Sequence, residues 1–394
     1  MLTAEGVGRE APKGDAPIAQ TVQGVTAFGH ALHAATAKPG DNSVISPLSI
    51  AYAYGLARAG AAGPTGSELD RVFGFPSQGP HSSFNALTRE IVTVDGAPPK
   101  PSKKSEDESE QGSDEPADPI VGIANGLFAQ KGLPIKPDFL TTAKSQYGAG
   151  VQTVDFAGDA TKTIDKWVRD QTAGRINKLF DQLDPATKLV LANAVYLKAD
   201  WQYPFTAKPT QNAPFTLMDG SKKTVELMQQ TASLRYAEGS GWQAVELPYA
   251  NSDLAMWVLV PAAGGAPGDL LRPAVLQQVS SGLTDTPVSV TMPRWDFGTD
   301  LDLMKPMAGL GLSSGDFSGI ADGARLEQAI HRANITVDER GTEAAAVTGL
   351  AFPVSAMDEP QTQIRADHPF AFTVVHKKTG APLFMGQVAD PKKK

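Results

Sequence analysis

A stretch of small residues near the C-terminus, Asp338–Met357, constrains the fold more than any other feature. In an extended strand, alternate side chains share a face. One face would therefore be small and uncharged throughout, formed by Thr342, Ala344, Ala346 and Thr348. Proline is absent between Arg340 and Phe352, so every backbone N–H there can join a β-ladder, which Pro353 should end. The stretch could enter an existing sheet, although its alanines also suit a helix or a plain loop.

Three segments near this stretch resemble one known family. Glu339–Ala346 resembles the hinge of the reactive-centre loop of inhibitory serpins, Ala366–Phe372 resembles a second serpin signature, and Leu383–Pro391 resembles the serpin C-terminal hairpin. Ala371 is smaller than the residue usual after the Pro-Phe pair. By this resemblance the hinge residues are Glu339, Gly341, Thr342, Glu343, Ala344, Ala345 and Ala346. The resemblance implies an α+β serpin fold, with a large mixed central sheet, surrounding helices and an exposed reactive-centre loop over residues 339–363.

The resemblance extends over a single domain, residues 18–391, preceded by a polar and mobile tail, residues 1–17. Asn42–Ile50 is similar to the start of serpin helix B, Ile164–Ile176 to helix F and its exit, and Trp201 with Pro204-Phe205 to a conserved family pattern. A β-rich and nearly continuous apolar run predicts a doubly buried strand over 189–198, and periodicity predicts a helix over 18–35. It also predicts strands over 123–130, 243–249, 254–261 and 288–293, and a helix over 301–310.

The net charge of −8 comes largely from one segment, because residues 105–118 hold seven acidic side chains and no basic one. A nucleic-acid partner and docking to an anionic membrane are therefore disfavoured. We interpret residues 98–119 as a disordered acidic insertion. By the resemblance it falls near helix D, where some serpins bind heparin through basic residues, so we expect no heparin activation here.

Cysteine is absent, which excludes disulfides and thiol chemistry. Residues 1–16 lack an apolar core segment, so the chain as given carries no signal peptide. The compartment stays open between a cytoplasmic protein and an extracellular one trimmed of its leader.

Enzyme and metal signals are weak. Gly311–Gly315 matches the Gly-x-Ser-x-Gly nucleophile elbow, but that motif needs a strand immediately before it, and the preceding residues have helical spacing. His30 and His33 lie three residues apart without an evident third ligand. The sequon at Asn334 lies in an apolar, strand-like run and should be unmodified. We therefore predict no enzymatic activity, no metal and no cofactor.

Four polar residues in apolar surroundings map by resemblance onto the serpin shutter, a network that controls opening of the central sheet. They are Ser46, Ser49, Asn193 and His331. Trp201 maps in the same way onto the breach, where the hinge enters the sheet. An ordinary buried hydrogen-bond set would look the same, because buried polar groups must be paired.

The resemblance implies suicide inhibition: a serine protease cleaves the loop, and the freed hinge inserts as a new strand and traps the acyl-enzyme. Phe352–Ser355 places the scissile bond at Val354–Ser355, while counting from Glu339 places it at Ser355–Ala356. Small residues at either bond favour elastase-like or subtilisin-like targets, and Phe352 and Met357 keep a chymotrypsin-like one open. Arg and Lys are absent between Gly341 and Gln363, which disfavours a trypsin-like target. We expect a monomer; the alternative is a non-inhibitory serpin acting as a carrier or chaperone.

Overall fold

The structure, a computed structural model, describes residues 1–94, 96–99, 116–180, 182–205, 209–312, 315–343 and 362–393. In these ranges the helices are α1 (Ile18–Thr36), α2 (Pro47–Arg58), α3 (Thr65–Phe73), α4 (His81–Ile91), α5 (Pro137–Tyr147), α6 (Ala160–Gln171), α7 (Pro273–Gly282), α8 (Met304–Gly309) and a 3-10 turn, η1 (Pro267–Leu271). The predicted helix over 18–35 is confirmed as α1. Ser46 caps α2 by accepting a hydrogen bond from the Ser49 N–H, and Pro47 occupies the first turn, where its missing N–H costs nothing.

The described strands form two sheets. The larger sheet has nine strands in the order β1 (Ser43–Ile45), β15 (Ala381–Val388), β14 (Phe370–His376), β8 (Leu254–Pro261), β7 (Trp242–Pro248), β6 (Lys222–Gly239), β9 (Thr284–Pro293) and β13 (Thr362–Arg365), with β5 (Gln211–Thr216) paired to β6. The smaller sheet has six strands in the order β10 (Trp295–Asp302), β11 (Gln328–Val337), β12 (Gly341–Thr342), β4 (Leu189–Asp200), β2 (Ile120–Gln130) and β3 (Val151–Val154). The predicted α+β fold with a large mixed sheet is confirmed.

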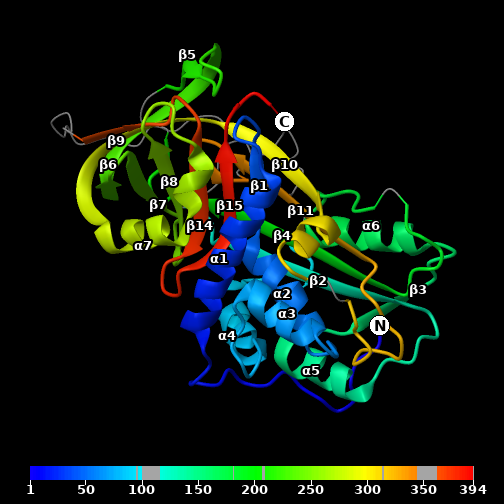
Figure 1. Cartoon of the computed structure of the whole chain (residues 1–394). Coiled ribbons are helices and arrows are strands. Elements are labelled where there is room, and N and C mark those ends of the chain that lie inside the picture. The colour runs from blue at the N-terminus through cyan, green and yellow to red at the C-terminus, as the bar shows by residue number, and fades with distance from the viewer. Residues whose placement is uncertain are drawn as a thin grey trace, which may run out of the picture.

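The central strand β4 is buried on both faces, as its apolar run predicts. Its even-numbered residues Val190, Ala192 and Ala194 pack with α6 in a small separate core. Its odd-numbered apolar residues face the main core. Figure 1 shows α6 beside β2 and β4, and α2 to α5 gathered at the opposite end of the molecule from β5.

Two segments differ from the sequence expectation. The stretch 301–310 is not one helix: Leu301 and Asp302 end β10, and α8 begins at Met304, because residues 295–302 pair along β11. The segment 1–17, expected to be a mobile tail, lies against the body. Leu2 and Val151 exchange two backbone hydrogen bonds at the edge strand β3, and Arg9 donates to Asn85 and Thr88 on α4. Its mobility in solution stays a prediction.

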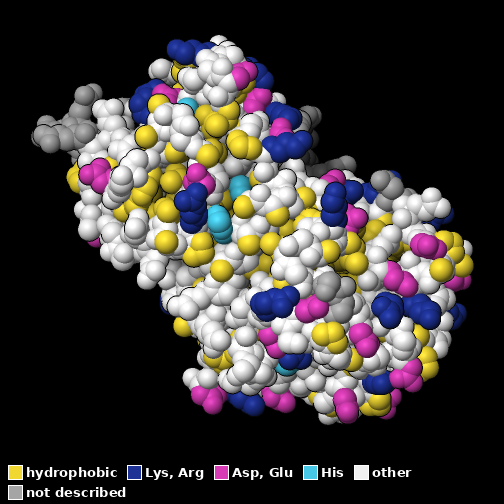
Figure 2. All heavy atoms as spheres, in the orientation of Figure 1, with side chains coloured by type: hydrophobic (Ala, Val, Ile, Leu, Met, Phe, Trp, Pro, Cys, Tyr) yellow, Lys and Arg dark blue, Asp and Glu magenta, His cyan; other side chains and the backbone are white. Residues whose placement is uncertain are grey.

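Acidic and basic side chains are intermixed over the face of the molecule in Figure 2. Within the described ranges, every helix falls short of the length or the apolarity that a bilayer crossing requires. Most of the predicted acidic insertion, residues 100–115, lies outside the described residues.

Candidate functional site: the hinge and the seam between β4 and β11

The site is a partly open seam between β4 and β11. The two strands pair in parallel where Gln328–Arg332 faces Val190–Ala194. Further along they separate, and β12 lies between them: Gly341 and Thr342 pair with Asp200 and Ala199 of β4, and Thr342 also faces Val337 of β11. The seam is therefore closed at one end and held apart at the other by the first two residues of the predicted inserting strand.

A tight turn brings the chain from β11 back into the sheet as β12. The Asp338 carboxylate accepts hydrogen bonds from the backbone N–H groups of Arg340 (2.8 Å) and Gly341 (3.2 Å). A Cβ at Gly341 would lie 2.1 Å from the backbone oxygen of Ala199. Only glycine fits between the strands at this point, because β4 approaches its α-carbon too closely for any side chain.

Trp201, predicted to belong to the breach, lies directly at this turn. Its indole N–H donates to the backbone oxygen of Asp338 (2.9 Å), and its ring stacks on Tyr249 with 4.5 Å between centroids. The Tyr249 hydroxyl lies 2.5 Å from the Thr342 hydroxyl. Thr342 is 2% exposed, so the side chain that the alternation argument places on the inward face is buried here.

Two ion pairs hold the acidic residues of the hinge. Arg294, the residue between β9 and β10, binds the Glu339 carboxylate (2.5 Å), which also accepts from Thr210. Burial raises the pKa of Glu339, but the hydrogen bonds from Arg294 and Thr210 outweigh it and leave this pKa lowered. Glu343 binds Arg175, which follows α6. Sequence reasoning missed both arginines, because nothing local marks a partner 45 or 168 residues away.

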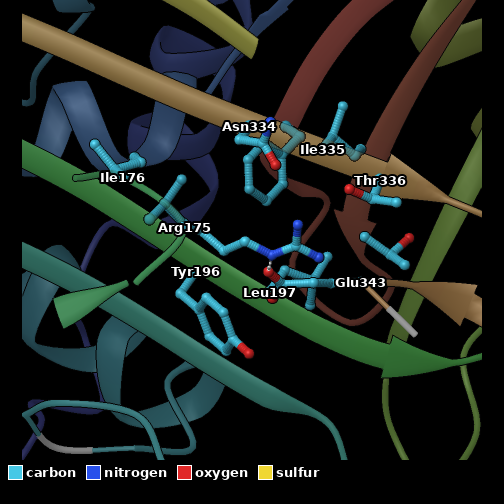
Figure 3. A pocket seen from close by; sticks show the side chains of 11 residues that line it. Arg175, Ile176, Tyr196, Leu197, Asn334, Ile335, Thr336 and Glu343 are labelled. Atoms are coloured by element: carbon cyan, nitrogen blue, oxygen red, sulfur yellow. Dashed lines mark hydrogen bonds and ion pairs between the residues drawn. The ribbon is translucent and has the colours of Figure 1, made fainter. Parts of the chain in front are cut away.

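Glu343 is the last described residue before the part of the loop that lies outside the described ranges. It adopts a left-handed backbone (φ 57°), and its N–H donates to the Thr336 oxygen (2.9 Å). Burial raises the pKa of its carboxyl, while Arg175 and Tyr196 act to lower it. Figure 3 shows the Arg175 guanidinium directed at the Glu343 carboxylate above Tyr196.

A narrow cavity lies in the seam ahead of β12. Its walls come from the two strands that have separated, its roof from the segment after α6, and its end from the hinge itself. It is lined by Arg175, Ile176, Val195, Tyr196, Leu197, Asn334, Ile335, Thr336, Thr342, Glu343 and Phe384. The cavity is small, about 10 Å³, and it lies where a strand that continued from Thr342 would run (Figure 3).

The four predicted shutter residues meet across the closed end of the seam. His331 and Asn193 are opposite each other in the β11–β4 register, and His331 Nδ1 lies 2.8 Å from Asn193 Oδ1. The Ser46 N–H donates to His331 Nε2 (3.1 Å), and the Asn193 amide donates to Ser49. Burial lowers the pKa of His331 to about 3, so the ring is neutral, with Nδ1 donating and Nε2 accepting.

Several predicted residues lie outside the described ranges: Ala344, Ala345, Ala346, Val354, Ser355 and Ala356. The serines of the Gly-x-Ser-x-Gly match, Ser313 and Ser314, also lie outside them, and the residues before that match form the helix α8 rather than a strand. His33 Nε2 lies 2.8 Å from the Ser43 hydroxyl. In the described part of the chain, no group of three or more His, Cys, Asp or Glu side chains is placed to hold a metal ion.

Comparison with known proteins decides the family. The family model described as serpin (serine protease inhibitor) matches residues 23–391. The chain belongs to the serpin family. An uncharacterized serpin-like protein of Thermococcus kodakarensis is 32% identical to this serpin over 387 residues, covering 94% of this chain and 86% of that protein. The leukocyte elastase inhibitor of Homo sapiens is 33% identical over 380 residues, covering 90% of this chain and 94% of that one.

The fold agrees with solved serpin structures. The thermophilic serpin tengpin in its native state superposes with a TM-score of 0.82 at 20% identity, covering 99% of this chain and 97% of that one. At this identity the likeness shows the fold. The serpin has relatives named as protease inhibitors, in a family that acts on proteases by inhibition rather than as catalysts.

Proposed function

We propose that this serpin inhibits serine proteases as a suicide substrate. The observation that carries the proposal is the position of β12, whose two residues are already paired between β4 and β11 at the point where these strands separate. The residues from Ala344 to Ala351 are small apart from Val347 and Leu350, and proline is absent up to Phe352. A protease that acylated the loop would free these residues to extend β12 along β4 and β11.

The driving force for this step is new β-ladder. About ten further residues in the central strand, at roughly 1 kcal/mol net per hydrogen bond, would give on the order of 10 kcal/mol. Opening the closed end of the seam costs part of this, because the parallel pairing of β4 with β11 and the His331–Asn193 hydrogen bond must separate. The balance favours insertion once the loop is cut.

The target should have a primary pocket that accepts small side chains. Val354–Ser355 is the scissile bond that the local sequence favours, with Ser355–Ala356 as the second choice. The relative named leukocyte elastase inhibitor supports an elastase-like target. We also expect an unchanged inhibition rate on adding heparin, since the insertion near helix D is acidic.

The test is incubation with an elastase-like protease at equal molarity, followed by a denaturing gel and mass analysis of the released C-terminal peptide. We expect a band at the summed mass and a cut within residues 352–358. Complete cleavage without that band would contradict the proposal and favour a non-inhibitory carrier or chaperone, the second candidate.

Thr342→Arg tests the insertion step in the same assay. Thr342 is buried between the strands, so an arginine there would bury a charge, and the variant should be cleaved as a substrate without forming the complex. Ala344→Pro should act in the same direction by removing a ladder N–H. Thr224→Arg, at an exposed position of β6, is the control and should inhibit like the parent protein.

A further inference from the structure

The extended backbone of β12 ends at Glu343. β12 runs antiparallel to β4, so an extended continuation beyond Thr342 would lead into the cavity between β4 and β11. The left-handed backbone of Glu343 prevents this continuation, and the Glu343 N–H is held by the Thr336 oxygen of β11. A residue other than glycine adopts such a backbone at a cost, and keeps it only where its surroundings hold it.

The Glu343 carboxylate supplies that hold. It lies at the cavity with 11% of its side chain exposed, bound to Arg175, whose own side chain is 40% exposed. Arg175 is itself fixed in place. The turn after α6 is closed by the Thr172 hydroxyl, which accepts from the Ile176 N–H (3.0 Å), and the Arg175 N–H donates to the Thr172 oxygen (2.9 Å). The arginine therefore lies over the seam on a fixed turn (Figure 3).

We propose that Arg175 is a positioning residue that stops insertion at two residues. By binding Glu343, it keeps the backbone of Glu343 left-handed and its carboxylate in the path of the strand. Further insertion requires the Glu343 backbone to become extended and to pair opposite Lys198 of β4, which would move the Glu343 carboxylate away from the position in which Arg175 binds it. The Arg175–Glu343 pair thus sets the barrier to loop entry, both after cleavage and in the intact protein.

This inference rests on the proposed function in one respect: only an inhibitory serpin would use the Arg175–Glu343 pair to time the trapping of a protease. The stop itself can be measured without any protease. An intact serpin whose loop enters its own sheet gains strand and unfolds at a higher temperature. The rate of this conversion at a fixed elevated temperature is read by calorimetry on monomer isolated by size exclusion at successive times.

The decisive variant is Arg175→Met, which keeps the apolar stem and removes the charge. It leaves the buried Glu343 carboxylate without its partner, so conversion should be about fivefold faster or more. Arg169→Met is the matched control, since Arg169 is an exposed arginine near the end of α6, and it should convert at the parent rate. Equal rates for these two variants would overturn the proposal.

A charge exchange separates the ion pair from a general effect of altering Arg175. Arg175→Glu alone should convert fastest, because it places two carboxylates together. Combined with Glu343→Arg, it should return to within about threefold of the parent rate, since the attraction is restored. A double variant as fast as Arg175→Glu would contradict the ion-pair argument. A parent protein that forms no complex with elastase would contradict the proposed function alone.

Discussion

The two sheets of this serpin differ in how completely their strands are paired. In the nine-stranded sheet, β14 is bonded to β15 on one side and to β8 on the other, and every residue of the three strands is buried. In the six-stranded sheet, β4 and β11 pair over five residues and then separate around the two residues of β12. The difference shows where conformational change can occur. The central strands of the larger sheet are hydrogen-bonded on both sides, whereas β4 and β11 are held apart by only two residues of β12.

Two glycines allow this contrast to be tested with the same substitution. A Cβ at Gly386 in β15 would lie 2.2 Å from the Ser43 oxygen, and one at Gly341 would lie 2.1 Å from the Ala199 oxygen. Gly386→Ala should lower the free energy of unfolding by about 3 kcal/mol or prevent folding, because the clash lies in a complete ladder within the core. Gly341→Ala should cost about 1 kcal/mol or less, because two paired residues can leave the sheet.

Urea unfolding measures the first effect, and hydrogen exchange of the peptide containing residues 339–343 measures the second. Exchange there should rise in Gly341→Ala and stay at the parent level in a folded Gly386→Ala protein. Similar losses of stability in the two variants would mean that the hinge is as firmly integrated as β15.

Removing His331, which we predict to belong to the shutter, should have the next largest effect. His331→Ala leaves Asn193 Oδ1 and the Ser46 N–H unpaired in a buried site, at a cost of about 2–4 kcal/mol. Thr373→Val is the comparison in the complete sheet, where one hydroxyl donates to the Phe384 oxygen, and should cost about 1 kcal/mol. Urea unfolding gives both values, and size exclusion after mild heating should show more polymer for His331→Ala alone. Unchanged stability, inhibition and polymerisation would remove the shutter role.

The same histidine predicts a pH dependence. Burial lowers the pKa of His331 from 6.5 to about 3, so between these values the unfolded chain binds a proton that the folded protein does not. Stability should therefore be greatest above pH 6.5 and fall with decreasing pH, by up to about 1.4 kcal/mol per pH unit from this group. His33 and His81, whose pKa values burial lowers to about 4, add to the fall. Plots of the unfolding free energy against pH should be less steep for His331→Gln than for the parent protein, and the difference in slope gives the contribution of His331. Equal slopes would show that protonation of His331 is not linked to unfolding.

Sequence reasoning predicted the parts of this contrast that depend on local pattern or on family motifs. The apolar run of β4, the start of α2 and the inward-facing Thr342 are each indicated by adjacent residues. The ion pairs that hold the hinge cannot be predicted from adjacent residues. Arg175 and Arg294 look like ordinary surface arginines in the sequence, and their partners Glu343 and Glu339 lie far along the chain. The docking of residues 1–10 was missed for a similar reason: its hydrogen bonds use mostly backbone groups, which every sequence possesses.

The smallest expected effect concerns two ion pairs of similar exposure. Arg294 binds Glu339 at the hinge, and Arg235 binds Glu246 within the nine-stranded sheet; each arginine side chain is 44% exposed. Replacing either by alanine should cost about 0.5–1 kcal/mol in urea unfolding, the range of partly exposed pairs. The consequences should differ, because Glu246 lies in the core of a sheet and keeps its hydrogen bond from the Trp257 indole. Glu339 keeps the hydrogen bond from Thr210, but it precedes a strand of only two paired residues. Hydrogen exchange at residues 339–343 should therefore rise in Arg294→Ala and not in Arg235→Ala.

Both variants could instead leave this exchange unchanged. The backbone hydrogen bonds from Trp201 to Arg340 and from Phe205 to Glu339 would then suffice to hold the hinge, and its position would be set by the backbone rather than by charge.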